Sequence, residues 1–149
     1  MACRANAGQL AAPGGVIYED ALWRLEHSLA PASRSGWLVL KTRRHCEGLD
    51  RLTEAEAAEL GPLLRRISAA LRAVTGAQNI YSVLLAESVA HLHIHLIPRR
   101  PDLPEHLRGP RVFDLLRQAA ETGVGVPEAV AAAMAQAVRR QLGPDDFAN

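Results

Sequence analysis

The pattern of apolar and polar positions in the first third of the chain predicts strands. Branched and aromatic residues gather in three short runs, residues 16–18, 22–27 and 36–42, which are separated by Glu19-Asp20 and by residues 30–35. Runs of this length, bounded by turn residues, are typical of antiparallel strands. Residues 1–15 mix small and breaker residues without a sustained period, so we expect a loosely ordered arm there.

A different period follows and predicts one long helix from Thr53 to Thr75. Thr53 and Glu56 have the spacing of a capping box, in which each side chain satisfies an exposed amide at the helix start. Gly76 supplies the stop, and Pro62 should kink the helix. Apolar residues recur three or four positions apart, as on one buried helical face: Ala57, Leu60, Leu64, Ile67, Leu71 and Val74.

Two more strands are expected over residues 78–86 and 91–97, the second ended by Pro98, which cannot donate to a sheet ladder. Helices should cover residues 112–121 and 127–142. This order predicts an α+β fold, a mainly antiparallel five-stranded sheet packed by a long helix, with further helices at the C-terminal end. We expect residues 16–149 to form a single domain.

Charge and composition narrow the classes of partner. The formal net charge is +1 at pH 7, so the chain lacks the broad basic field that drives nucleic-acid binding. No apolar run reaches the ~18 residues that a membrane span needs. The chain has two cysteines, Cys3 and Cys46, and no secretory signal at its start. We therefore expect a cytoplasmic protein with a small-molecule partner, and neither nucleic acid nor membrane.

Three histidines at alternate positions carry the chemistry. Within a strand, His91, His93 and His95 would share one face, while Leu92, Ile94 and Leu96 would share the other. Neutral imidazole titrates near cell pH, so one ring can attack while a neighbour donates a hydrogen bond. Two other interpretations are a solvated edge face and a zinc site, since His-x-His on a strand is a common zinc pair.

The segment His91-Leu-His-Ile-His-Leu-Ile97-Pro-Arg99 resembles the motif of the histidine triad (HIT) family, and it matches at every position. Gly36-Trp-Leu-Val-Leu40, Arg44-His45, Leu52-Thr53-Glu54 and Glu87-Ser88-Val89-Ala90 are similar to other family segments. The resemblance covers about residues 16–115. It implies a homodimer that joins its sheets, with no cofactor, and a small purine nucleotide held with its α-phosphate over the histidines.

The resemblance also implies roles for single residues. His93 would be the nucleophile that takes the nucleotidyl group, His95 would stabilise the phosphoryl oxygens, and His91 would orient the attacking ring. Ser88 would hydrogen-bond the phosphate. Glu87 stands where the family usually has glutamine and would face the leaving group, and Arg99 would contact leaving-group phosphates. Candidates for an apolar base pocket, or else plain core, are Ile17, Trp23, Leu25 and Trp37.

Two departures from the family pattern bear on ligands. Some members hold a structural zinc with two cysteines, the histidine of the basic turn and the first triad histidine. The matching positions here are Cys3, Asn6, His45 and His91, and the second thiolate is missing, so we expect no metal. The acidic or amide residue that binds the ribose has no counterpart in residues 27–30.

Three functions remain open on sequence grounds. The first is a hydrolase or nucleotidyl transferase acting at the α-phosphate of a dinucleoside polyphosphate or a nucleoside phosphoramidate. The second is a nucleotide-binding regulator with little turnover, for which Glu87 and the missing ribose ligand are the arguments. The third is a zinc-dependent hydrolase that uses the three histidines as ligands.

Overall fold

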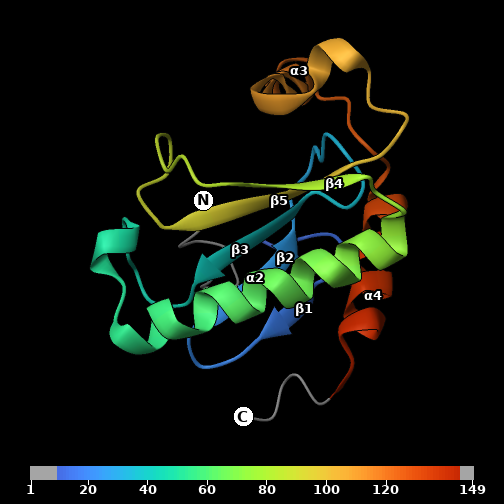
Figure 1. Ribbon diagram of the computed structural model, residues 1–149. Coiled ribbons are helices and arrows are strands. Elements are labelled where there is room, and N and C mark those ends of the chain that lie inside the picture. Colours follow the sequence, from blue (N-terminus) through green and yellow to red (C-terminus); the bar gives the residue numbers. More distant parts are fainter. Residues whose placement is uncertain (1–9, 145–149) are drawn as a thin grey trace.

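The computed structural model describes residues 10–144, and these form one antiparallel sheet with helices packed on it (Figure 1). The strand order is β1-β2-β3-β5-β4. The predicted α+β fold class is confirmed, down to the five strands. The strands are β1 Val16–Glu19, β2 Trp23–His27, β3 Leu38–Thr42, β4 Asn79–Val83 and β5 His93–Arg99.

One face of the sheet is apolar because the strands alternate as the sequence predicts. Leu38 and Leu40 of β3 are fully buried, as are Leu96 of β5 and Leu92 just before that strand. The helix α2, Glu54–Thr75, covers this face with Leu63, Ile67 and Leu71 among others. Burial of these side chains is the main source of the stability of the sheet and helix layers.

The start and end of α2 follow from local chemistry. Thr53 and Glu56 form the predicted capping box, with each side chain bonded to the other's main-chain amide. Gly76 ends the helix in the left-handed conformation at φ 65°. Pro62 lies inside α2 on its exposed side, and the helix is continuous through it.

The helix α4, Glu128–Leu142, packs beside α2 and against β1 and β2 (Figure 1). Gly14, at φ 75°, allows the close approach of the chain start, because a Cβ there would lie 2.8 Å from the Ala132 oxygen. Gly14, in the described end of the expected arm, thus lies against α4, and Ala12 is buried. Cys3 and Asn6 lie outside the described residues.

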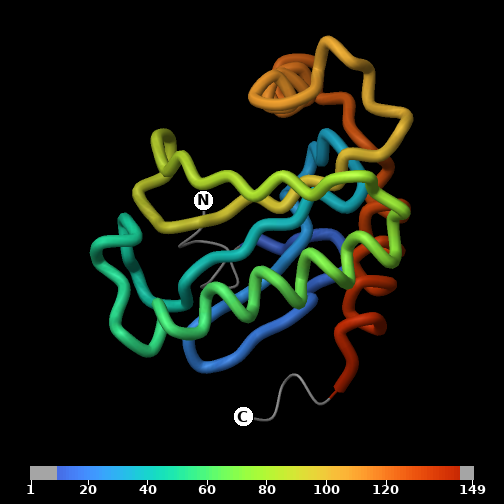
Figure 2. Tube along the Cα trace, viewed as in Figure 1, coloured from blue at the N-terminus to red at the C-terminus, as the bar shows by residue number. Residues whose placement is uncertain are grey.

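A second apolar cluster joins the segment that follows β5 to the sheet, at Trp37 and Ile97. After β5 the chain forms two 3-10 turns, Glu105–Leu107 and Gly109–Phe113, and then α3, Asp114–Thr122. Trp37, Ile97, Leu103 and Val112 form the buried centre of this cluster. Figure 2 shows the segment set apart from α2 and α4. None of the helices within residues 10–144 is both long and apolar enough to cross a membrane.

The expected bounds of the last strand were wrong at both ends. β5 begins at His93 rather than His91, because the preceding amides bond elsewhere: His91 N–H to Val89 oxygen and Leu92 N–H to Cys46 oxygen. The strand continues through Pro98, which pairs with Ile80 of β4. The β3 partner ends at the Leu38–Leu96 pair, so the missing N–H of Pro98 breaks no bond to β3.

Candidate active site

The structure brings two of the three histidines to one open face and buries the third. His93 and His95 lie side by side on β5, with ring centroids 5.1 Å apart and ring planes at 81°. His91, in the bend before β5, is 1% exposed. Its Nε2 lies 2.7 Å from the Thr42 carbonyl oxygen, to which it donates, and burial lowers its pKa. The expected row of three exposed rings is therefore reduced to two.

The ring of His93 is oriented by the main chain of His91. Nδ1 of His93 lies 2.7 Å from the His91 carbonyl oxygen. A carbonyl oxygen only accepts, so Nδ1 carries the proton and Nε2 keeps its lone pair. His93 lines the cavity described below, so this arrangement offers an unprotonated nitrogen to a ligand.

The ring of His95 is held by aromatic neighbours. Nε1 of Trp37 lies 2.9 Å from Nδ1 of His95, and the Phe113 ring meets His95 edge to face at 5.3 Å. Burial lowers the pKa of His95 to about 4, and the electrostatic effect of the neighbouring His93 acts in the same direction. His95 is therefore neutral across the physiological range of pH.

A cavity of about 200 Å³ opens beside the two histidines. Its walls come from β2, β3, β5, the loop before β5, and α3. The lining combines apolar and polar side chains, and its members are Glu26, His27, Ser28, Leu29, Val39, Lys41, Val89, His93, His95 and Leu116. A concave site that joins apolar walls to a few polar groups is typical of small-ligand binding.

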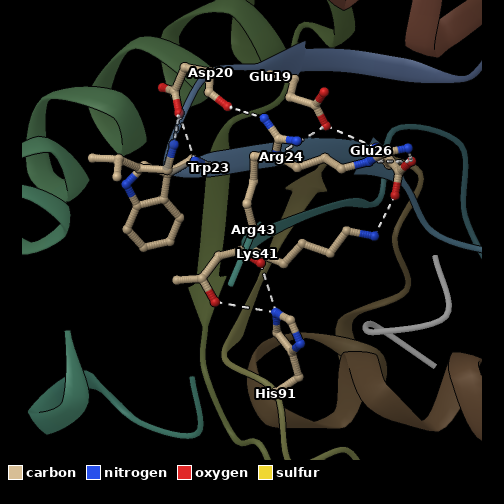
Figure 3. Close-up of polar contacts among 10 residues, drawn as sticks. Glu19, Asp20, Trp23, Arg24, Glu26, Lys41, Arg43 and His91 are labelled. Atoms are coloured by element: carbon tan, nitrogen blue, oxygen red, sulfur yellow. Dashed lines mark hydrogen bonds and ion pairs between the residues drawn. The ribbon is translucent and has the colours of Figure 1, made fainter. Parts of the chain in front are cut away.

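One wall carries a buried network of charges. Glu26 lies between two cations: one oxygen accepts from Nε and Nη2 of Arg24 at 2.9 and 2.7 Å, and the other accepts from Nζ of Lys41 at 2.5 Å (Figure 3). Arg24 also bonds Glu19 at 2.9 Å. Glu26 and Lys41 are 4% and 3% exposed. Lys41 is the strand partner of His93, which places this pair next to the nucleophile candidate.

His27, also on the wall, has a structural role. Its Nδ1 donates to the Ser28 carbonyl oxygen at 3.0 Å, and its Nε2 accepts the Gly36 amide at 2.9 Å. Burial lowers its pKa, so the ring is neutral. Because both nitrogens are bonded to the main chain, His27 closes the connection between β2 and β3 and has no nitrogen left for a ligand.

The other predicted substrate residues lie outside the cavity lining. Glu87 and Ser88 are exposed in the loop before β5, adjacent to Val89 of the cavity wall. Arg99 donates to Gln78 at 3.0 Å at the far end of β5. Ile17 is 1% exposed and belongs to the core under α2. Trp37 is fully buried and does not line the cavity, and its contact with the site is the hydrogen bond to the His95 ring.

The sequence prediction missed Glu26 and Lys41. A signal was present, because Lys41 alternates with Leu40 and Thr42 at an open-face position of a strand that the pattern placed in the sheet. Recognising the pair required the register that sets Glu26 opposite Val39 and Lys41 opposite His93.

Within residues 10–144, no group of three His, Cys, Asp or Glu side chains is arranged to hold a metal ion, either near the positions that match the family's zinc ligands or elsewhere. The His45 ring lies 5.5 Å from that of His91, and its Nε2 is 3.3 Å from a Glu47 oxygen. The thiol of Cys46 is buried and donates to the Gly48 oxygen. Cys3 and Asn6, the other two positions that match the family's zinc ligands, lie outside the described residues.

Comparisons with known proteins identify a family whose members share this fold. The family model described as "HIT domain" matches residues 9–102. No curated protein matches the sequence. A hypothetical histidine triad nucleotide-binding protein from Sulfolobus tokodaii has a similar structure, at 18% identity and TM-score 0.70, covering 94% of this chain and 89% of that one.

Two further solved structures show the same fold. A Zn-bound histidine triad family protein from Mycobacterium smegmatis is 20% identical with TM-score 0.68, over 94% of this chain and 92% of that one. A histidine triad protein from Bradyrhizobium japonicum is 21% identical with TM-score 0.61, over 85% and 89% respectively. Residues 9–102, which the family model matches, include every strand and both candidate histidines.

Proposed function

This chain belongs to the HIT family, and on that premise we propose that it is a hydrolase or nucleotidyl transferase that acts at the α-phosphate of a small nucleotide. The substrate class is a dinucleoside polyphosphate or a nucleoside phosphoramidate. The observation that carries the proposal is the bond from Nδ1 of His93 to the His91 carbonyl, because it leaves the Nε2 lone pair available beside the cavity.

The reaction has two displacements at phosphorus. Nε2 of His93 attacks the α-phosphorus, a P–N bond forms, and the bond to the leaving group breaks with its electron pair going to the leaving group. The ring then carries a positive charge, and the His91 carbonyl stabilises it through the Nδ1–H bond. Water, or another acceptor, next attacks phosphorus, loses a proton, and returns the electron pair of the P–N bond to His93.

His95 would stabilise the charge on the phosphoryl oxygens during both steps. Its ring is adjacent to that of His93 and is neutral, so it can donate a hydrogen bond without repelling the cationic intermediate on His93. Ser88 would reach the phosphate from the exposed loop next to Val89.

The nucleoside would lie over Val39, which faces the cavity between the histidines and β2. Leu29, Val89 and Leu116 offer apolar surface for a purine base. The Lys41–Glu26 pair offers a donor and an acceptor side by side, which suits the sugar hydroxyls.

A nucleotide-binding regulator with little turnover is the second candidate. The exposed Glu87 next to Ser88 favours it, because a carboxylate near the phosphate-binding loop repels an anionic ligand. The two candidates bind the same ligand and differ in whether His93 becomes modified.

The experiment is to quench the protein in alkali during incubation with diadenosine polyphosphates and adenosine phosphoramidates, and to map modified peptides by mass spectrometry. A histidine phosphoramidate persists in alkali, so we expect a nucleotidyl group on His93. The His93→Ala variant should bind nucleotide and release no product. A parallel reaction in strong chelator should proceed at the same rate. Binding without modification of the wild type would favour the regulator, and loss of activity in chelator that zinc restores would favour the zinc hydrolase.

A further inference from the structure

The indole of Trp37 and the imidazole of His95 form a hydrogen bond whose direction is fixed by chemistry. Nε1 of Trp37 and Nδ1 of His95 are 2.9 Å apart, although the two residues are 58 positions apart in the chain. An indole N–H can donate and has no acceptor. Nδ1 of His95 must therefore accept, which requires an unprotonated nitrogen at that position.

The neutral ring of His95 then carries its proton on Nε2. The alternative tautomer and the imidazolium both place a proton on Nδ1, where it would face the Trp37 N–H. The surroundings prevent the indole from turning away, since Trp37 is fully buried and Phe113 packs on both rings, at 5.4 Å from Trp37 and 5.3 Å from His95. A donor-to-donor contact in such a site has no water to relieve it.

The two neighbouring histidines are consequently held in opposite tautomers. His93 has its proton on Nδ1, from which it donates to the His91 carbonyl. His95 has its proton on Nε2, because its Nδ1 accepts the Trp37 N–H. One ring offers a lone pair and the next offers an N–H, and both rings line the same cavity. A nucleophile and a donor to the attacked phosphoryl group require this combination.

We propose that Trp37 is a positioning residue that fixes the tautomer of His95, so that His95 donates from Nε2 to the phosphoryl group attacked by His93. The role of His95 in turnover rests on the proposed function above. The tautomer itself is a property of the resting protein and does not depend on any substrate.

The chain provides a matched control in its other tryptophan. Trp23 is also fully buried, but it lies in the core under α2, and its indole N–H has no hydrogen-bond partner among the described residues. Trp23→Phe therefore removes a buried indole without touching either histidine. It also leaves Trp37 as the one tryptophan of the chain, since the sequence has two.

The experiment uses the Trp23→Phe protein in which tryptophan is replaced by β-(3-benzothienyl)alanine. Sulfur takes the place of the N–H in this analogue while the shape of the ring is kept, so the fold is preserved. The tautomer and the pKa of His95 are read by ¹⁵N NMR of the imidazoles, with His95→Gln used to assign the signals. Turnover is measured on the same samples.

We expect His95 to be protonated on Nε2 in the wild type and in Trp23→Phe. With the analogue, Nδ1 should become protonated in part, the pKa of His95 should rise, and kcat should fall roughly tenfold with little change in KM, as for loss of one hydrogen bond. A wild-type His95 protonated on Nδ1, or an analogue that leaves tautomer and pKa unchanged, would overturn the proposal. A protein with no turnover would contradict the proposed function, and the NMR spectra would still decide the role of Trp37.

Discussion

The main-chain oxygen of His91 accepts a hydrogen bond from Nδ1 of His93 over 2.7 Å, and the side chain of His91 is itself anchored to the Thr42 carbonyl over the same distance. The first histidine thus acts on the second through its backbone, from a position that is 1% exposed. The side chain keeps the bend rigid, and the carbonyl sets the tautomer of the nucleophile candidate.

Replacing His91 by alanine should therefore reduce kcat without abolishing it, by roughly 10- to 100-fold, since misplacing a reacting group by about 1 Å can cost 10²-fold. The His91→Ala protein should still form the nucleotidyl adduct on His93, but more slowly. Adduct formation is followed by rapid quenching and mass spectrometry. Thr42→Val is the control, because it removes the weaker hydroxyl contact at 3.2 Å and keeps the carbonyl. If His91→Ala left the rate of adduct formation unchanged, the bend would not position His93.

Local patterns in the sequence were sufficient to predict the sheet, the long helix and the face that carries the histidines. Alternation along a strand assigns each side chain to a face, which separated the buried Leu92, Ile94 and Leu96 from the face of the histidines. A capping box is a contact between residues three apart, so Thr53 and Glu56 were identified without knowledge of the fold.

Contacts between distant segments were beyond such patterns. The period of two gave no sign that His91 leaves the strand, because that depends on where its amide finds an acceptor. The Trp37–His95 bond and the Glu26–Lys41 pair depend on the register of three strands. Trp37 was assigned to a base pocket or to plain core, and both options missed its bond to the site.

The Glu26–Lys41 pair should determine whether the protein distinguishes ribose from deoxyribose. Lys41→Met removes the donor beside the sugar, so KM for a ribonucleotide should rise roughly tenfold while KM for its 2′-deoxy analogue changes little. KM values for the two substrates are measured side by side. Glu19→Gln is the control, because Glu19 lies at the outer, partly exposed end of the same network. Equal losses for both substrates would mean that the pair supports the wall and does not read the sugar.

Lys41→Met also leaves Glu26 without one of its two cations, which destabilises a buried carboxylate. The double variant Glu26→Gln, Lys41→Met removes the unpaired charge and should recover part of the lost stability. Its loss of ribose preference should match that of the single variant, because residues in one network are not additive. Thermal unfolding of all three proteins separates the effect on stability from the effect on recognition.

The free edge of β4 should carry a dimer interface, as the family resemblance implies, together with the adjoining side of α2. β4 is the last strand of the sheet, and Leu85, just after it, is 57% exposed. Light scattering at micromolar concentration should give a dimer for the wild type, and Leu85→Glu should weaken it. Val124→Glu is the control, since Val124 is 72% exposed but lies in the connection between α3 and α4, outside β4 and α2. A monomeric wild type would contradict this prediction.

A pair of carboxyl groups links the turn between β1 and β2 to α2. Asp20 accepts the amides of Leu22 and Trp23, both at 2.7 Å, and the Tyr18 hydroxyl also donates to it. Burial opposes the charge of Asp20, but these bonds keep its pKa below the ordinary value. Burial, and then the hydrogen bond and charge of Asp20, raise the pKa of Glu59 on α2 to about 7, although Arg66 acts in the opposite direction. Glu59 is thus the member of the pair that holds a proton near neutral pH.

This raised pKa makes part of the stability depend on pH. The folded protein binds one more proton than the unfolded chain between pH 4.5 and about 7, so the contribution of Glu59 to the free energy of unfolding falls as pH rises through this window. Glu59→Gln keeps a donor for Asp20 and removes the titration. The variant should unfold at the same temperature as the wild type near pH 5 and about 3 °C higher at pH 8. The variant and the wild type are compared at each pH, because His27, His91 and His95, whose pKa values are lowered, destabilise both proteins alike as pH falls below 6.5.

The control is Glu54→Gln, an exposed change in the first turn of the same helix, which should shift the unfolding temperature by the same amount at every pH. If the difference in unfolding temperature between Glu59→Gln and wild type stayed constant from pH 5 to pH 8, Glu59 would not be the group that titrates in this window.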